Sequence, residues 1–466
     1  MAGERDWFDE VPLPALLRAA RRAYGAAIRA ALADAGCDDM PRNGSYVIGA
    51  IARTGASLSQ IITGLGVSKQ AAGQLVDTLV TRGYLDRSPD PGDRRRLTVT
   101  LTERGHAAAT VIRSVIERVD ADLAGRVGAE HVAHTRATLA ALISGIVGSQ
   151  STQFPKVATH VPDGAKPESR VKRFARWVDN AHITAERYFV PYAEVMLAHL
   201  AIQTLVLVID GSVVGRGCVA LMIHVVYKGR ALPLTWVVRR GKKGHFPEDL
   251  HIALITQVQE LIPPGAHVVV LGAGEFDGTG LQHTLQEAGW SYVVRTGSNI
   301  TVAWDGDTFR CETVGACIKP GTLVELRDVL FTEAAYGPIM LLCCWAKGYK
   351  EPLYLVTNIA AADEACRWYA KRFRIETFFS DQKSRGFHLH KSHISKSIRL
   401  SRLLMAACLA YIWIVYLGAL CEQDGWVRII HRGDRCDLSL FQLGLRLLGY
   451  LLNEECTIPV AFYISI

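Results

Sequence analysis

The stretch Tyr369-Ala-Lys-Arg372-Phe-Arg-Ile-Glu376-Thr-Phe-Phe-Ser-Asp-Gln-Lys383 decides the fold of the larger part of this chain. Neither Gly nor Pro interrupts the stretch, so it is able to form one helix. Tyr369, Arg372, Glu376 and Lys383 are spaced by three, four and seven residues, which places them on one face. The opposite side carries apolar residues, namely Phe373, Ile375 and Phe379. An ordinary solvated face with an Arg–Glu pair is the simpler interpretation of the same spacing.

The spacing Y-x2-R-x3-E-x6-K resembles the signature of cut-and-paste bacterial DDE transposases, which have an RNase-H-like core. This resemblance covers about residues 150–466. It implies that Glu376 is the third metal-binding carboxylate and that Tyr369, Arg372 and Lys383 hold the DNA end. It also implies Mg²⁺ or Mn²⁺ as the cofactor of an active site, and double-stranded DNA as the partner.

Length and composition set the broad class of the chain. With 466 residues, of which 49% are hydrophobic, the chain should form more than one globular domain. A formal net charge of +7 permits nucleic-acid binding without proving it. The 11 Cys form no CxxC pair, which favours a reduced cytoplasmic, nucleoid-associated protein over a disulfide scaffold. The acidic N-terminus is not typical of a signal peptide.

Residues 403–421 are nearly all apolar and are long enough to span a bilayer. The alternative is a helix buried on all sides in a large core. We favour the core helix, because the stretch closely follows the signature, where the resemblance places closing core helices. We therefore expect no membrane partner.

The N-terminal third contains the pattern of a helix-turn-helix. Residues 57–68 predict a short helix, a turn with Gly, and the start of a second helix, with Ser68 as its N-cap. The second helix, residues 69–82, buries Leu75, Leu79 and Val80. Its N-terminal end should enter the major groove of DNA. The DNA-binding candidates there are Ser68, Lys69, Gln70 and Gln74.

A β-hairpin should follow this helix. A turn rich in Pro, Gly and Asp precedes the alternating Leu97, Val99 and Leu101 of a return strand. The tip of the hairpin carries three arginines that are able to reach phosphates or the minor groove, namely Arg94, Arg95 and Arg96. A charged, exposed turn is the alternative interpretation of the arginine run.

Residues 12–146 resemble the MarR family of winged-helix regulators. The resemblance rests on the wing around Asp93 and Arg95, the Leu-Thr-Glu-Arg-Gly run that ends at Gly105, and long helices on both flanks. It implies a homodimer built from those helices, at about residues 13–35 and 102–146, on a pseudo-palindromic operator. We expect Cys37, the one Cys of this segment, to be structural.

The sequence therefore predicts a multi-domain chain. Residues 1–147 form an α-rich winged helix-turn-helix domain, and residues 148–168, rich in Pro and small residues, form a linker. Residues 169–466 form an α/β RNase-H-like domain with a β-rich insertion at about 296–350. In that insertion, Trp304 is either a core residue or a base-stacking residue.

Carboxylates at strand ends are the candidate catalytic groups. Residues 205–210 form an apolar strand that ends at Asp210, the first carboxylate position of the resemblance. The next strand, residues 267–272, should deliver the second one, but Leu271 and Phe276 set a register that puts Ala273 there. Glu275 or Asp277 would replace it only if the loop rearranged, since two strand residues span about 6–7 Å. The predicted metal ligands are thus Asp210 and Glu376.

The segment after the signature holds His388, His390 and His393 among several Lys and Arg residues. We interpret it as a DNA-backbone contact or an ordinary surface rather than as a metal site. Three functions compete for the whole chain: a DNA-binding regulator that no longer cuts, an active transposase with a relocated second carboxylate, and an inactivated copy of an active parent. We favour DNA binding with impaired catalysis.

Overall fold

The computed structural model describes residues 25, 27–41, 44–54, 69–89, 97–127, 129–161, 163–241, 246–263, 265–432 and 436–459. The chain divides into two compact units. The first comprises Met1–Ala137 with Val195–Ile202, and the second comprises Thr138–Glu194 with Gln203–Ile466.

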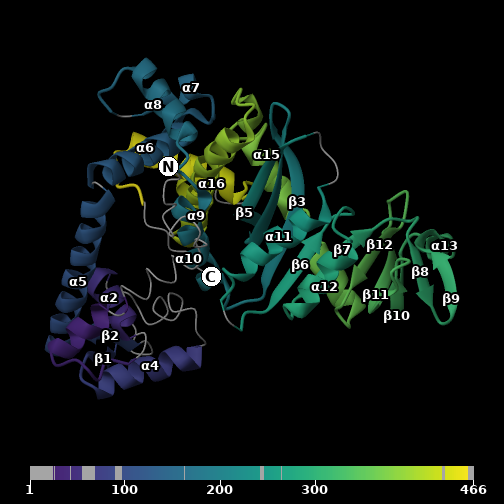
Figure 1. Cartoon of the computed structure of the whole chain (residues 1–466), viewed down its shortest axis with the longest axis horizontal. Coiled ribbons are helices and arrows are strands. Elements are labelled where there is room, and N and C mark those ends of the chain that lie inside the picture. The colour runs from purple at the N-terminus through teal and green to yellow at the C-terminus, as the bar shows by residue number, and fades with distance from the viewer. Residues whose placement is uncertain are drawn as a thin grey trace, which may run out of the picture. The chain divides into compact units, whose positions relative to one another are not determined.

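The first unit is a small helical domain with one hairpin (Figure 1). Its elements are α2 (Gly44–Thr54), α4 (Lys69–Thr81), β1 (Leu85–Pro89), β2 (Leu97–Leu101), α5 (Glu103–Val127) and the first part of α6 (Ala129–Ser149). Strands β1 and β2 pair antiparallel, as the alternating residues predict. The expected helix at 13–35 is helical in its described part, residues 27–34. The expected helix at 102–146 is described as α5 and α6.

One apolar core holds this unit together. This core contains buried residues from every described element up to α5, from Leu32 to Ile112. It includes Cys37, which is 5% exposed. On α4, Val76 and Leu79 are fully buried, whereas Leu75 and Val80 are packed against the core from its edge. Burial of such apolar side chains stabilises a domain by roughly 25 cal/mol per Å².

The second unit is built on a ten-stranded sheet within the part of the chain that the structure describes, in the order β5-β4-β3-β6-β7-β12-β11-β10-β8-β9. The first five strands are β3 (Leu205–Gly215), β4 (Cys218–Tyr227), β5 (Arg230–Arg240), β6 (Val268–Gly272) and β7 (Ser291–Thr296). Strands β3, β4 and β5 form an antiparallel meander, and β6 and β7 run parallel to β3. Near-continuous burial of β3, β4 and β6 places them at the centre of the core.

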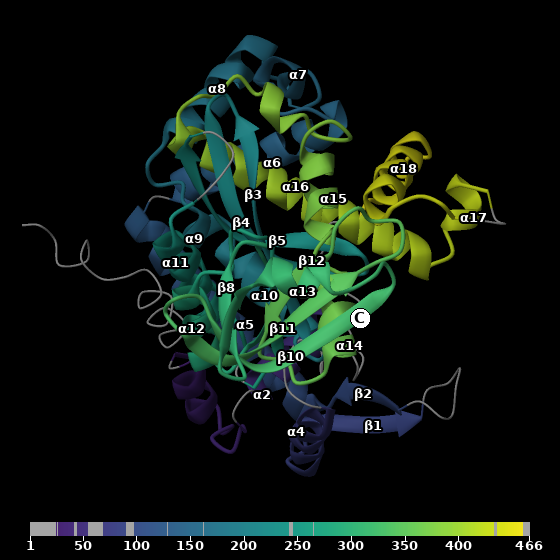
Figure 2. The same ribbon diagram turned by 90° about the vertical axis from the view of Figure 1, so that its right-hand side faces the viewer.

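The expected β-rich insertion extends this same sheet (Figure 2). It contains β8 (Thr301–Trp304), β9 (Asp307–Arg310), the helix α13 (Cys311–Ala316), β10 (Thr322–Phe331) and β11 (Tyr336–Trp345), and β12 (Leu353–Thr357) joins it to β7. Trp304 is 38% exposed, and its indole N–H donates to the carbonyl of Arg327. Trp304 is therefore not a buried core residue.

Helices cover both faces of the central strands. Successive residues of a strand point to opposite faces, so Asp210 and Ser212 share one face of β3, and Gly211 belongs to the other. Helix α15 (Arg374–Gln382) lies on the Asp210 face, since Phe378 packs 4.4 Å from the ring of His224 on β4. Helix α11 (Glu248–Gln259) lies on the Gly211 face, next to α12 (Thr279–Glu287).

The apolar run at 403–421 belongs to α16 (Ser397–Gln423), which is long and apolar enough to cross a membrane by composition. In the structure it is buried among α18 (Leu440–Asn453), β5 and α8 (Pro167–Asp179). Of its most apolar window, 89% is buried inside the unit, as expected for a core helix. The remaining helices are α9 (Ala185–Tyr188), α10 (Val190–Leu200), α14 (Ala362–Tyr369) and α17 (Val427–Ile430).

The segment 148–168 differs from the linker that its composition predicts. It contains α7 (Phe154–Ala158), whose Val157 and Ala158 are fully buried against the second unit. The side chains of Thr152 and Gln153 donate to the carbonyls of His388 and Lys391. The segment is therefore packed, in part through hydrogen bonds to residues more than 200 positions away in the sequence.

Candidate functional site

The candidate DNA-reading residues of the first unit lie at the start of α4. Lys69 and Gln70 occupy its first turn, and Gln74 is exposed one turn later. The buried Val76 and Leu79 fix the opposite side of the helix. Gln74 therefore lies on the exposed side of α4. The contact of Lys69, Gln70 and Gln74 with a groove of DNA stays a prediction. Ser68, Arg94, Arg95 and Arg96 lie outside the described residues.

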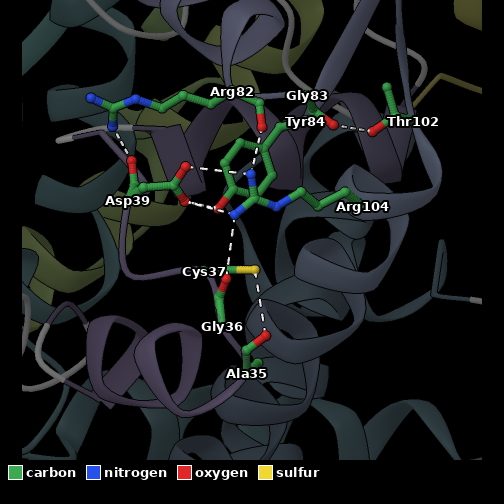
Figure 3. A network of polar contacts seen from close by, with 9 residues as sticks. All are labelled: Ala35, Gly36, Cys37, Asp39, Arg82, Gly83, Tyr84, Thr102 and Arg104. Carbon is green, nitrogen blue, oxygen red and sulfur yellow. Dashed lines mark hydrogen bonds and ion pairs between the residues drawn. The ribbon is translucent and has the colours of Figure 1, made fainter.

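A polar network anchors the base of the hairpin to the first unit (Figure 3). The guanidinium of Arg104 donates to the carboxylate of Asp39 at 2.9 Å and to the carbonyl of Arg82 at 2.6 Å. It also lies 4.3 Å above the ring of Tyr84, whose hydroxyl donates to Asp39 at 2.5 Å. The Tyr84 hydroxyl and Arg104 hold the pKa of the Asp39 carboxyl below its usual value.

The signature is not one uninterrupted helix. Helix α14 ends at Tyr369, residues 370–373 turn, and α15 begins at Arg374. Through the turn, amides donate to carbonyls three residues earlier, for example Arg372 to Tyr369 and Glu376 to Phe373. This tighter winding brings both Tyr369 and Arg372 into the interior, at 5% and 8% exposure.

The turn also changes the apolar side that the sequence predicts. Ile375 is fully buried and Phe379 is 8% exposed, as expected, but Phe373 is 51% exposed. Phe373 lies outside because it belongs to the turn and not to the buried stripe of α15. The guanidinium of Arg372 covers its ring at 4.4 Å.

Arg372 lies between the two predicted metal ligands. Its Nη1 is 3.6 Å from Oδ2 of Asp210, and its Nη2 is 3.0 Å from Oε1 of Glu376. Asp210 comes from the middle of β3, just where the parallel pairing with β6 ends at Ile209. The fold therefore brings together a strand residue and a helix residue that are more than 160 positions apart, and one guanidinium joins them.

Tyr369 and Lys383 flank this centre. Burial raises the pKa of the Tyr369 hydroxyl, while Arg372 and Arg295 oppose that shift. The ammonium of Lys383 donates to Oγ of Ser212 at 2.6 Å. The four signature residues thus gather around β3, although the helix that carries them is broken.

The end of β6 lies beside Asp210. Ile209 and Gly272 form the last pair of the parallel β3–β6 ladder, and Asp210 and Ala273 each follow directly after that pair. Ala273 lies just past the end of β6. The residue at this strand end is therefore an Ala, which carries no carboxylate.

Neither nearby carboxylate takes that place in this structure. After Ala273 the chain forms a tight turn, in which the amide of Phe276 donates to the carbonyl of Ala273 at 3.0 Å. The Glu275 carboxylate lies on the Gly211 side of β3, because a Cβ at Gly211 would be 3.3 Å from its Oε1. Asp277 accepts from the Thr296 hydroxyl at 2.7 Å, at the end of β7.

The residues as arranged do not fit a divalent metal ion. Such an ion needs several oxygen ligands around one point, whereas here a guanidinium takes the place between Asp210 and Glu376. Within the described ranges, no group of three His, Cys, Asp or Glu is placed to hold a metal.

Sequence reasoning missed Ser212, the partner of Lys383. Alternation along β3 could have found it, since Ser212 is two residues from Asp210 and shares its face. It also missed that Arg372 contacts both carboxylates, for which the sequence contains no local signal.

Two families of known proteins match different parts of the chain. Residues 38–96 match the MarR family, and residues 203–413 match the transposase DDE domain. A search of curated proteins found no match. One similar solved structure is the transcriptional regulator Tm0710 from Thermotoga maritima, with 25% identity and a TM-score of 0.21, covering 25% of this chain and 82% of that one.

A second similar structure is the piggyBac transposase in a synaptic complex with hairpin DNA. It shares 13% identity and a TM-score of 0.35, covering 62% of this chain and 65% of that chain. Each family match covers less than half of the chain. The chain therefore combines a segment similar to the MarR family with a longer segment similar to the transposase DDE domain.

Proposed function

We propose that this chain is a cytoplasmic, nucleoid-associated DNA-binding protein, derived from a transposase, that regulates transcription and has impaired DNA cleavage. The MarR-like segment reads an operator through α4 and the arginine wing, as a homodimer. The DDE domain holds DNA through Tyr369, Arg372 and Lys383. The two segments supply different kinds of contact, sequence reading by the first and backbone holding by the second.

The order of the sheet supports an RNase-H-like core for the DDE domain. An antiparallel meander, β3–β4–β5, adjoins parallel β6 and β7 on the other side of β3. Asp210 is on β3, and Ala273 directly follows its parallel neighbour β6, in keeping with the first and second carboxylate positions of such a core.

The observation that carries impaired cleavage is that Ala273, and not a carboxylate, follows the last pair of the β3–β6 ladder, directly after which Asp210 stands on β3. Two metal ions that align attacking and leaving oxygens need bridging carboxylates, and a methyl group supplies neither ligand nor charge. Glu275 lies on the other face of β3, and Asp277 is held by Thr296. Both placements weigh against the alternative of an active transposase with Glu275 or Asp277 as its second carboxylate.

A cleavage assay with a supercoiled plasmid and Mg²⁺ or Mn²⁺ tests this proposal. We expect DNA binding without efficient nicking by the chain as given, and a gain of nicking by Ala273→Asp of about a hundredfold or more. The expected size follows because a lost ligand costs several kcal/mol of transition-state stabilisation, and about 1.4 kcal/mol is tenfold in rate. Asp210→Asn combined with Ala273→Asp is the control and should remain inactive.

Efficient cleavage by the unaltered chain would contradict impaired catalysis. If Glu275→Gln or Asp277→Asn then abolished that cleavage, the relocated carboxylate would be identified. If cleavage survived both changes and was lost in Asp210→Asn, two carboxylates would be sufficient.

A further inference from the structure

The segment that follows the signature is fixed against β3. It contains the short 3₁₀ turn Leu389–Lys391, which contacts β3, with His388 just before it in a left-handed conformation at φ 52°. The hydroxyl of Thr152 donates to the carbonyl of His388, and the side-chain amide of Gln153 donates to the carbonyl of Lys391 at 3.0 Å. Because these bonds use backbone carbonyls, they position the segment and leave its side chains for other contacts.

His388 and His390 lie next to each other among basic side chains. Their ring centroids are 6.0 Å apart, and within the described part of the chain the Nδ1 of each ring is buried without a hydrogen-bond partner. Burial lowers the pKa of both imidazoles, and the positive neighbours lower it further. For His388 these neighbours are Lys391 and Lys156, and for His390 they are Lys391, His388 and Lys383.

This cluster begins at the candidate DNA site. Lys383 is both the last residue of the signature and a neighbour of His390. Its ammonium donates to Ser212, which shares the face of Asp210 on β3. Ser212 and Asp210 are two residues apart on the strand, which corresponds to about 6–7 Å. An anion held by Lys383 and His390 would therefore lie close to Asp210.

An anion is the ligand that suits this arrangement. The lysines around the two imidazoles are positively charged, so they would repel a metal cation. A phosphate oxygen, by contrast, accepts hydrogen bonds from imidazolium and ammonium groups and neutralises their mutual repulsion. DNA supplies phosphates at regular spacing along a strand, and the strand in question has to pass Asp210.

We propose that His388 and His390, with Lys383, Lys391 and Lys156, form a site for a backbone phosphate of DNA. When the phosphate binds, the two imidazoles take up protons. This inference rests on the proposed DNA binding by the DDE domain. It adds that the affinity for DNA depends on pH through these two histidines.

The sign of the effect follows from linkage. In the free protein the pKa of both imidazoles is below the usual value, so they are neutral near pH 7. A bound phosphate favours the charged form and raises those pKa values. DNA affinity should therefore rise as the pH falls through the pKa values of the bound state, by about tenfold for each unit of pKa shift at one histidine.

The experiment measures binding of the full chain to a labelled duplex of random sequence by fluorescence anisotropy, at pH 6 and pH 8 and constant ionic strength. The variant is His388→Asn with His390→Gln, since Asn tolerates the left-handed backbone of His388. The matched control is His283→Gln, which removes an exposed histidine that pairs with Glu287 on α12. Circular dichroism checks that all three proteins are folded.

We expect the unaltered chain and His283→Gln to bind about tenfold or more tightly at pH 6 than the double variant does. At pH 8 the three proteins should agree within about twofold. Equal pH dependence in all three proteins, with DNA binding retained, would overturn this inference and leave the proposed function intact. Absence of DNA binding at both pH values would instead remove the proposed function.

A second measurement does not depend on the variants. In the unaltered chain labelled with ¹³C-histidine, adding the duplex at pH 7 should move two histidine resonances toward imidazolium positions. No movement would contradict the proposal. The same movement with millimolar inorganic phosphate alone, and none with the duplex, would assign the site to a free anion and overturn the DNA assignment.

Discussion

At the scale of single residues, the Leu-Thr-Glu-Arg-Gly run shows why particular amino acids are required. Thr102 donates to the carbonyl of Gly83 at 2.6 Å and accepts from the amide of Gly105 at 3.1 Å, which caps the start of α5. Arg104 joins Asp39 and the carbonyl of Arg82. Gly105 itself faces the backbone of Tyr84, where a methyl group would collide with the carbonyl oxygen.

Gly105→Ala should therefore destabilise the first unit. A side chain there has to displace backbone, and overpacking of this kind costs about 1–3 kcal/mol of unfolding free energy. Hydrogen exchange of the core amides of α2, measured by mass spectrometry, reports on this unit separately from the second one. Faster exchange is the expected result.

Gly73→Ala is the matched control for this prediction. Gly73 is also helical and in the same unit, but a Cβ there would meet nothing within 4 Å. Replacing Gly by Ala in a helix normally stabilises by up to about 1 kcal/mol. If both variants protected the amides equally, the collision at Gly105 would not exist in solution.

At the scale of elements, α15 connects the signature to the sheet through a buried ion pair. Arg230 on β5 and Asp381 on α15 approach to 3.0 Å, with 12% and 7% of their side chains exposed. Burial raises the pKa of the Asp381 carboxyl to about 6, although Arg230 opposes the shift. Desolvation of the carboxylate thus outweighs its attraction to Arg230.

The pH dependence of stability should show this pair. A carboxyl whose folded pKa lies above its unfolded value binds more protons in the folded state. Its stabilising contribution is complete below about pH 4 and is lost as pH rises through about 6, a change of roughly 3 kcal/mol. In Asp381→Asn, the unfolding free energy of the second unit, measured with urea, should depend less on pH between pH 4 and 6.

A control variant distinguishes the effect of Asp381 from that of an exposed carboxylate. Asp179→Asn serves as the control, because Asp179 pairs with Arg399 at 2.9 Å but is 55% exposed. It should leave the slope nearly unchanged, since exposed pairs contribute little. An unaltered slope in Asp381→Asn would show that the carboxyl is ionised throughout this range.

At the scale of the whole molecule, the flanking helices of the MarR-like segment are the proposed dimer interface. Helix α5 has 25 residues, and among its side chains described up to residue 118, those of Ala108, Ala109, Ile112 and Val115 are buried. Ile116 is an apolar side chain of α5 that is 38% exposed. An exposed apolar side chain on a flanking helix is a suitable contact for a partner.

The full chain should therefore sediment at twice the mass of one chain, and Ile116→Glu should shift it toward monomer by placing a charge at an apolar contact. Glu117→Gln, an exposed neighbour on the same helix, should leave the dimer unchanged. A monomer at all concentrations of the unaltered chain would exclude this interface.

The sequence by itself determined the elements whose signals are local. The strand at 97–101 and the start of α4 at Lys69 agree with the structure residue by residue. Alternating or continuous apolar residues, bounded by turn residues, specify these elements wherever they pack. That the register of Leu271 and Phe276 puts Ala273 at the second carboxylate position stays a prediction.

The tertiary structure alone decided how those elements meet. The break in the signature at 370–373, the position of Arg372 between two carboxylates, and the packing of 148–168 each depend on residues distant in the sequence. So does the placement of Glu275 on the opposite face of β3 from Asp210. Spacing along one helix cannot reveal such contacts, because burial against a particular strand overrides local preference when it removes enough surface from water.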